Sequence, residues 1–228
     1  MLKIQASLPY AWPHDGRFVA EHTALLIIDM QRDFCDPAGY MAAAGSDLAG
    51  VSVVIDRICA VRAAFAAWGA TIIHTREGHR PDLSDLLPVK RFRSRNAGAE
   101  IGARGPLGRF LIRGEVGWDF VDKLTPSPGE PIIDKPGYTA FRQTDLDIVL
   151  NARSISKLIV CGVTTDVCVS STLRDATELG YECLTLQDCC WSPSTACHEA
   201  TLATIKSEGG IFGALAFSAD VIAAVGKH

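Results

Sequence analysis

The sequence predicts an α/β protein, a three-layer sandwich in which a doubly wound sheet lies between two layers of helices. Two observations lead to this fold class. Short runs of strand-forming residues alternate along the chain with longer segments whose apolar residues have helical spacing. Most of the strand candidates are continuously apolar, which is typical of strands buried on both faces of a parallel sheet. Alternating units of this kind connect parallel strands through right-handed crossovers.

The strand candidates are five short runs rich in apolar residues. In chain order they are Thr23–Asp29, Ala70–Thr75, Pro131–Asp134, Lys157–Gly162 and Glu182–Gln187. We expect these runs to lie side by side in the sheet.

The helix candidates lie between and after these runs. Val51–Trp68 has apolar residues at helical spacing and is followed by Gly69 in the stop position. Further helices are predicted over Asp145–Asn151, Asp166–Leu179 and Ser194–Ser207. The segment 98–117 is rich in glycine but contains neither a G-x-G-x-x-G motif nor a P-loop, so it is interpreted as a surface loop and not as a nucleotide site.

The composition is that of a globular domain. The chain has 228 residues, of which 48% are hydrophobic and 21% are charged. We expect one domain over residues 1–228, with residues 1–22 forming an extended N-terminal arm that contains prolines. A net charge of −4 argues against a nucleic-acid partner. Residues 1–20 lack the apolar stretch of a signal peptide, and no span reaches transmembrane length, so no membrane partner is expected.

Cysteine usage and one basic run complete this picture. The eight cysteines include no C-x-x-C pair, and without a secretion signal reduced thiols are expected, which indicates a cytoplasmic protein. The run Lys90–Arg95 (KRFRSR) is the one dense basic segment. In an acidic protein it is interpreted as a solvated loop or a subunit contact.

Three polar positions follow predicted strands, where open α/β sheets bind their ligands. Asp29 follows the first strand, Lys135 follows the third, and Cys168 lies just beyond the fourth at the start of a predicted helix. A cysteine attacks as the thiolate, which a helix N-terminus and a lysine stabilise, and an aspartate can move the thiol proton. Most unpaired cysteines are structural, so the residues alone leave open whether Cys168 is a nucleophile or a core residue.

Three segments also resemble one enzyme family. "LLIIDMQRDF" at 25–34, "IIDKPGYTAF" at 132–141 and "VCGVTTDVCVSSTLRDATELGY" at 160–181 are similar to the signature blocks of isochorismatase-like cysteine hydrolases. The resemblance implies a six-stranded parallel sheet and a catalytic triad of Asp29, Lys135 and Cys168. It also implies a cis peptide bond at Val163–Thr164, an oxyanion hole formed by the amides of Thr164 and Cys168, and a homo-oligomer, either a dimer or a tetramer.

No cofactor or metal is expected. Nicotinamidases share the fold of the resembled family and bind a divalent ion through an Asp-x-His pair and a second histidine. The segment after Asp29 contains no histidine, and His74 and His79 lack the spacing of a ligand pair on one helix face.

Within the family, the segments "HTREGHRPDLSDL" at 74–86 and "EGGIFG" at 208–213 resemble biuret hydrolases and, more distantly, ureidoacrylate amidohydrolases. The resemblance implies hydrolysis of a small ureido compound, with biuret as the main expectation and guanylurea, triuret or ureidoacrylate as alternatives. A non-catalytic interaction protein is the remote alternative. Seven residues are the candidate substrate contacts: Phe34, Arg76, Tyr138, Phe141, Thr164, Thr165 and Glu208. Glu208 is the candidate specificity residue, because a carboxylate favours a cationic or NH2-rich group.

Overall fold

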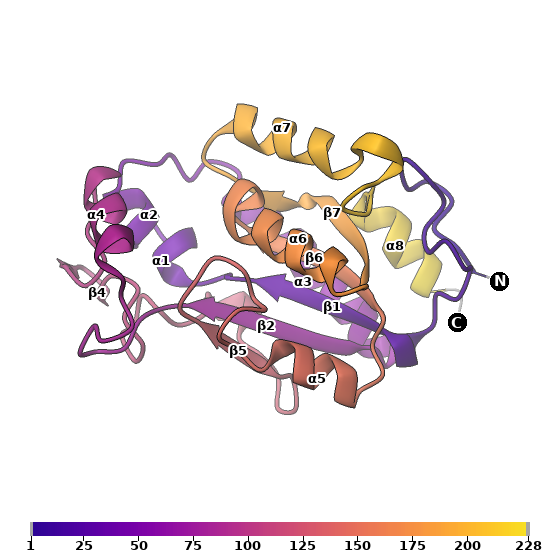
Figure 1. Cartoon of the computed structure of the whole chain (residues 1–228), viewed down its shortest axis with the longest axis horizontal. Helices are drawn as coiled ribbons and strands as arrows, with labels where there is room; N and C mark the ends of the chain where they lie inside the picture. Colours follow the sequence, from indigo (N-terminus) through magenta and orange to yellow (C-terminus); the bar gives the residue numbers. More distant parts are fainter. Residues whose placement is uncertain (1, 227–228) are drawn as a thin grey trace.

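Six strands form one parallel sheet at the centre of the computed structural model, which describes residues 2–226 (Figure 1). In sheet order they are β5 (Ile132–Lys135), β2 (Thr71–Glu77), β1 (Thr23–Ile28), β6 (Lys157–Val163), β7 (Glu182–Trp191) and β8 (Ala214–Ala216). The chain winds outward from β1 in one direction and from β6 in the other. The predicted α/β fold with a six-stranded parallel sheet is confirmed, and the crevice between β1 and β6 is the expected ligand position.

Helices cover both faces of the sheet, which explains the continuously apolar strands. One face packs against α3 (Val51–Trp68) and α8 (Ser218–Val225). The other packs against α5 (Leu146–Ala152), α6 (Ser170–Glu178) and α7 (Thr195–Ile205). All six residues of β1 are buried, and successive side chains of the strand enter opposite halves of the core.

Some elements differ from the sequence-based prediction. The predicted helix over Asp166–Leu179 is a π-helical turn, η3 (Thr165–Val169), that continues directly into α6. Strand β7 extends four residues beyond its predicted end. Strand β8 and helix α8 did not come from the residue pattern, because a three-residue strand and an eight-residue helix are too short to show a clear period.

The basic run is a helix and not a loop. Helix α4 (Pro88–Asn96) begins at a proline in its first turn, a position that favours helix initiation. Together with the short helices α1 (Arg32–Cys35) and α2 (Tyr40–Ala43), it lies beyond the carboxyl ends of β1 and β2, at the left of Figure 1. The 98–117 segment is irregular apart from a two-stranded hairpin of β3 (Arg104–Gly105) and β4 (Gly108–Arg109).

The N-terminal segment packs on its own chain. Leu8 pairs with Leu215 of β8, and Trp12 and Phe18 are buried in the core on the side of α3 and α8. Three short 3₁₀ turns complete the fold, η1 (Ala20–His22), η2 (Asp122–Leu124) and η4 (Ser207–Gly209). None of the helices within residues 2–226 is both long enough and apolar enough to span a membrane.

Candidate active site

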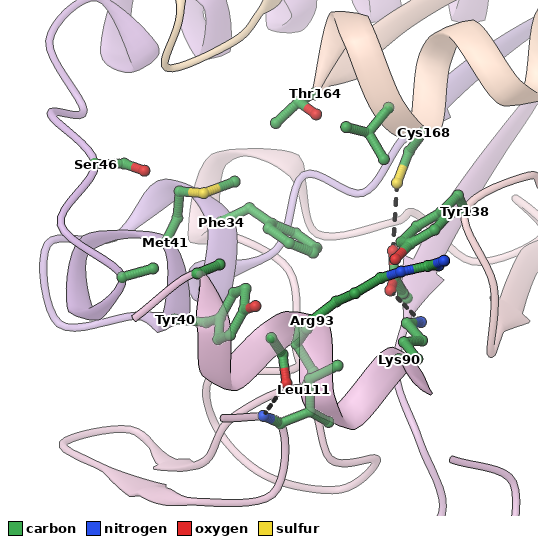
Figure 2. A pocket seen from close by; sticks show the side chains of 16 residues that line it. Phe34, Tyr40, Met41, Ser46, Lys90, Arg93, Leu111, Tyr138, Thr164 and Cys168 are labelled. Carbon is green, nitrogen blue, oxygen red and sulfur yellow. Dashed lines mark hydrogen bonds and ion pairs between the residues drawn. The ribbon is translucent and has the colours of Figure 1, made fainter. Parts of the chain in front are cut away.

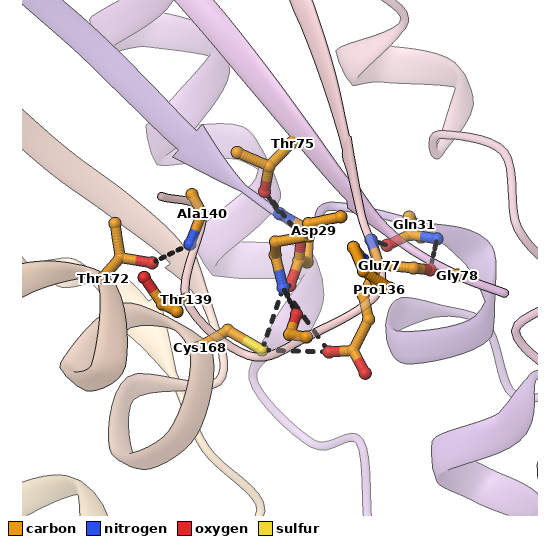
Figure 3. A network of polar contacts seen from close by, with 12 residues as sticks. Asp29, Gln31, Thr75, Glu77, Gly78, Pro136, Thr139, Ala140, Cys168 and Thr172 are labelled. Carbon is orange, nitrogen blue, oxygen red and sulfur yellow. Dashed lines mark hydrogen bonds and ion pairs between the residues drawn. The ribbon is translucent and has the colours of Figure 1, made fainter. Parts of the chain in front are cut away.

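The structure brings Asp29, Lys135 and Cys168 together at the carboxyl edge of the sheet. Figure 3 shows Asp29 and Cys168 within the polar network that they share with Glu77. Lys135 Nζ lies 2.7 Å from Asp29 Oδ2 and 3.4 Å from Cys168 Sγ. All three side chains are buried, and Cys168 alone of the three reaches the wall of a pocket. Three segments more than 30 residues apart in the chain therefore meet around one ammonium group.

Local backbone geometry sets the position of Asp29. The residue has a left-handed φ of 51°, which aspartate tolerates better than most residues. The Thr75 hydroxyl donates to Asp29 Oδ1 at 2.6 Å, and the Asp29 amide donates to the same hydroxyl oxygen at 3.2 Å. Strand β6 approaches β1 closely at this point, so a Cβ at Gly162 would clash with the Ile28 carbonyl oxygen. Glycine is therefore required beside Asp29.

Cys168 projects from the irregular turn that follows β6. The turn η3 is π-helical, a conformation that occurs often at functional sites, and it carries Cys168 as its fourth residue. The Val163–Thr164 peptide bond is cis, as the family resemblance implied. Thr164 lines the pocket beside Cys168.

A second carboxylate, Glu77, completes the cluster. Its Oε2 accepts the Cys168 thiol hydrogen bond at 3.3 Å and lies 3.5 Å from Lys135 Nζ, while Lys90 Nζ donates to Oε1 at 2.5 Å. Arg76 and Glu77 both follow the second predicted strand, and of the two only Arg76 is among the candidate substrate contacts. Successive residues of a strand point to opposite faces, so placing Glu77 in the site turns Arg76 away.

Arg76 is instead held by groups outside the pocket. Its guanidinium pairs with Asp134 at 2.8 Å and Asp119 at 3.2 Å, and it stacks 3.7 Å from the centre of the Trp118 ring. Arg76 is not among the residues that line the pocket of Cys168, so its expected contact with substrate stays a prediction that this pocket does not support.

The charges of the cluster determine its protonation. Burial alone would raise the pKa of Glu77, but the Lys90 and Lys135 ammonium groups outweigh it and lower the pKa to about 2. Burial alone would lower the pKa of Lys135. The neighbouring Asp29, Cys168 and Glu77 outweigh burial and raise this pKa above the usual range. Lys135 and Glu77 are therefore both charged at neutral pH.

Cys168 rests as a thiol. Burial raises its pKa well above the ordinary value, and the Asp29 and Glu77 carboxylates raise it further against the opposing effect of Lys135. The pKa of the thiol is therefore raised and not lowered, because burial of the sulfur and the two facing carboxylates outweigh the effect of Lys135. Burial and the charge of Glu77 also raise the pKa of Asp29. The arrangement thus offers a thiol next to a carboxylate whose proton affinity is increased.

Asp29, Glu77 and Cys168 are residue types that can bind a metal ion. One ligand atom each from Asp29, Glu77 and Cys168 lies within 4.8 Å of the others. The Lys135 ammonium contacts all three residues, so it already supplies the positive charge that a metal ion would bring. His74 and His79 pair with Glu130 and Asp85, respectively, outside this cluster.

The pocket in front of Cys168 has a volume of about 310 Å³ (Figure 2). Phe34, Tyr138 and Thr164 line it, as expected for substrate contacts. Its wall also includes groups that the sequence analysis did not identify, which are Tyr40, Met41, Ser46, Lys90, Arg93 and Leu111. The signal that could have found Lys90 and Arg93 is their i, i+3 spacing within the basic run.

Three other predicted contacts lie elsewhere. Phe141 packs against Tyr181, with ring centres 5.7 Å apart, and Thr165 is buried with its hydroxyl 2.8 Å from His198 Nδ1. Glu208 is exposed in η4, between α7 and β8. Because this turn precedes β8, it lies at the amino edge of the sheet, opposite the pocket. None of these three residues lines the pocket of Cys168, so their expected contacts with substrate stay predictions.

Asp33 supports the pocket wall and leads to a prediction about pH. It accepts hydrogen bonds from the backbone amides of Leu111 at 2.7 Å and Tyr40 at 3.3 Å. Burial nevertheless raises its pKa from 3.8 to about 6. The folded chain therefore binds the Asp33 proton more tightly than the unfolded chain does. Protonated Asp33 contributes to the free energy of unfolding fully below about pH 4, and this contribution is lost as the pH rises through about 6.

We expect Asp33→Asn, which does not titrate, to remove this pH dependence. The Tm of wild type minus the Tm of Asp33→Asn, both measured by calorimetry, should decrease as the pH is raised from about 4 to about 7. An equal difference at both ends of the range would contradict the assignment.

Comparison with known proteins places these features in context. Residues 23–216 match the model of the isochorismatase domain family. Ureidoacrylate amidohydrolase RutB from Azorhizobium caulinodans is 35% identical over 183 residues, covering 78% of this chain and 80% of that protein. RutB from Cronobacter turicensis is 37% identical over 183 residues, with 78% of each chain covered. The crystal structure of a cysteine hydrolase from Pseudomonas syringae pv. phaseolicola superposes with a TM-score of 0.77 at 28% identity, covering 91% of this chain and 94% of that one.

Proposed function

The chain belongs to the isochorismatase family, and on that premise we propose that it is a cysteine-dependent amidohydrolase that cleaves a C–N bond of a small ureido compound. The observation that carries the proposal is the contact of the Cys168 thiol with the Lys135 ammonium in a buried cluster with Asp29. Cys168 lines the pocket, whereas Asp29 and Lys135 are buried and do not line it. A bound substrate would therefore contact the Cys168 sulfur and not the other two side chains.

In this mechanism Asp29 takes the Cys168 proton as the sulfur attacks the carbonyl carbon of the bound substrate. Lys135 stabilises the negative charge as it passes from Asp29 to the Cys168 sulfur. The amides of Thr164 and Cys168 are the proposed donors to the oxyanion of the tetrahedral intermediate. The C–N bond then breaks, Asp29 gives its proton to the departing amine or ammonia, and a thioester remains on sulfur.

Hydrolysis of the thioester restores the enzyme. Asp29, now unprotonated, takes a proton from a water molecule whose oxygen attacks the thioester carbon. The C–S bond breaks, and the proton returns from Asp29 to the Cys168 thiolate. The raised pKa of Asp29 suits this alternation between base and acid.

For the substrate, the relatives support a ureidoacrylate-type compound better than biuret. Both RutB relatives are named for ureidoacrylate, and their alignments cover more than three quarters of this chain. Guanylurea was an alternative because the Glu208 carboxylate could bind a cationic group, but Glu208 is not among the residues that line the pocket. We therefore propose ureidoacrylate-type ureido compounds as substrates, in place of the biuret that the sequence resemblance favoured.

A substrate panel tests this assignment. Release of amine or ammonia is measured with ureidoacrylate, biuret, triuret and guanylurea. We expect ureidoacrylate to have the highest kcat/KM. Preference for biuret would contradict the proposed substrate, and hydrolysis of none of the four would contradict the proposed function.

Glu77 raises the pKa of Cys168, and this effect can be measured directly. In Glu77→Gln the negative charge beside the sulfur is lost, so the pKa of Cys168 should fall. We expect alkylation of the Cys168 peptide by iodoacetamide, followed by mass spectrometry, to begin at a lower pH than in wild type. The control is Glu130→Gln, a partly buried carboxylate paired with Arg62 and His74 outside the pocket. An unchanged or higher pH of alkylation in Glu77→Gln would refute the prediction.

A further inference from the structure

Three cationic side chains belong to the pocket and its buried cluster, and two of them are paired. Lys135 contacts Asp29 and Glu77, and Lys90 donates both to Glu77 and to the Pro136 carbonyl at 2.6 Å. The third, Arg93, lines the same pocket. Within residues 2–226 no carboxylate forms an ion pair with it, so the pocket carries one uncompensated positive charge.

The position of Arg93 differs from that of its neighbours on α4. Arg91 and Arg95 both pair with Glu100, at 2.5 and 2.6 Å, on the side of the helix away from the pocket. Lys90 and Arg93 lie three residues apart and share the opposite side. Figure 2 shows the Arg93 side chain extending from α4 along the pocket in the direction of Tyr138. The basic run is thus divided into two outer arginines that share the Glu100 carboxylate and an inner arginine that pairs with no carboxylate among residues 2–226.

The surroundings of Arg93 suit a bound anion. Much of the pocket wall is apolar, including Phe34, Met41, Ile101 and Leu111. The planar guanidinium matches a carboxylate in a two-point contact, and such charge-assisted hydrogen bonds are stronger than those between neutral groups. Arg93 is exposed, so a ligand that enters the pocket from solvent can reach its guanidinium, and a neutral ligand would form no ion pair there.

We propose that Arg93 binds a carboxylate of the substrate, so that the enzyme selects ureido acids over neutral ureido compounds. This inference rests on the proposed function and adds a specificity residue to it. The ureido carbonyl lies at Cys168, and the acid end of the same molecule pairs with Arg93. Biuret, which has no carboxylate, lacks the second contact.

A matched pair of substrates isolates the charge. The compounds 3-ureidopropionate and 3-ureidopropanamide differ in one group, which is an anionic carboxylate in the first and a neutral amide in the second. Steady-state kinetics of carbamoyl-group removal are measured for wild type, Arg93→Gln and Arg93→Lys. The control is Arg95→Gln, the same change on the same helix outside the pocket.

We expect Arg93→Gln to lower kcat/KM for the acid by about 10- to 100-fold, mainly through KM, as for loss of a charge-assisted hydrogen bond. The amide should change little, Arg93→Lys should recover part of the loss, and Arg95→Gln should behave like wild type. Equal losses for acid and amide in Arg93→Gln would overturn the inference, because they would indicate a structural role.

Binding to an inactive variant separates this inference from the proposed function. Calorimetric titration of Cys168→Ala with the same two ligands needs no turnover. Tighter binding of the acid that disappears in Cys168→Ala/Arg93→Gln supports the anion site even if neither compound is hydrolysed, in which case the proposed function fails alone. Hydrolysis of both compounds without any preference for the acid would leave the proposed function intact and overturn the role of Arg93.

Discussion

Replacing Cys168 by serine is expected to lower kcat by at least about 10³-fold for every ureido substrate, the scale seen when an enzyme loses its nucleophile. A serine hydroxyl is far less acidic than a thiol, so Asp29 cannot activate it in the same way. The replacement removes little volume from the pocket wall, and the Tm should stay close to that of wild type.

A second cysteine provides the control for this experiment. Cys197 is exposed on α7 and does not line the pocket, so Cys197→Ser should retain full activity. Substantial turnover by Cys168→Ser, with a normal Tm, would show that the reaction does not pass through a thioester at this residue.

Replacing Lys135 by methionine is expected to impair both activity and stability. The ammonium is fully buried between Asp29 and Glu77, and removing it leaves two carboxylates with Lys90 alone to balance them. Breaking a buried ion pair from one side typically costs about 3–5 kcal/mol of stability. Loss of the charge that stabilises the reacting anions should lower kcat by about 10²–10³-fold.

The stability loss in Lys135→Met should depend on pH. Without the ammonium, the pKa of Asp29 rises further, because Lys135 is the main group that lowers it. A carboxyl group with a raised pKa in the folded state destabilises the fold as the pH rises through that pKa. The deficit relative to wild type, measured by urea denaturation, should therefore shrink at acidic pH.

Lys157 is a matched control for Lys135. It is also buried and pairs with a carboxylate, Asp15 at 3.0 Å, but it lies at the start of β6, away from the pocket. Lys157→Met should lose stability and keep its activity. If Lys135→Met behaved in the same way, Lys135 would be a structural residue and not part of the reaction.

The fold was largely predictable because its main signals are local. Strands buried on both faces have continuously apolar sequences, and α3 ends at the glycine that follows its apolar period. Short elements were missed for the same reason: β8 has three residues, and the basic composition of α4 concealed a helix that begins at Pro88. A period needs several turns or alternations before it can be recognised.

The triad positions were found in the sequence because each lies at or just after the end of a strand, and all parallel strands end at one edge of the sheet. The chain by itself therefore determined the fold class and the positions of Asp29, Lys135 and Cys168. Only the tertiary structure decided which side chains surround them. It turned Glu77 inward and Arg76 outward, placed Glu208 at the far edge of the sheet, and divided the α4 cations between pocket and solvent. The physical reason is that strand register, helix docking and the balance of buried charges depend on contacts between segments distant in sequence, which no single segment encodes.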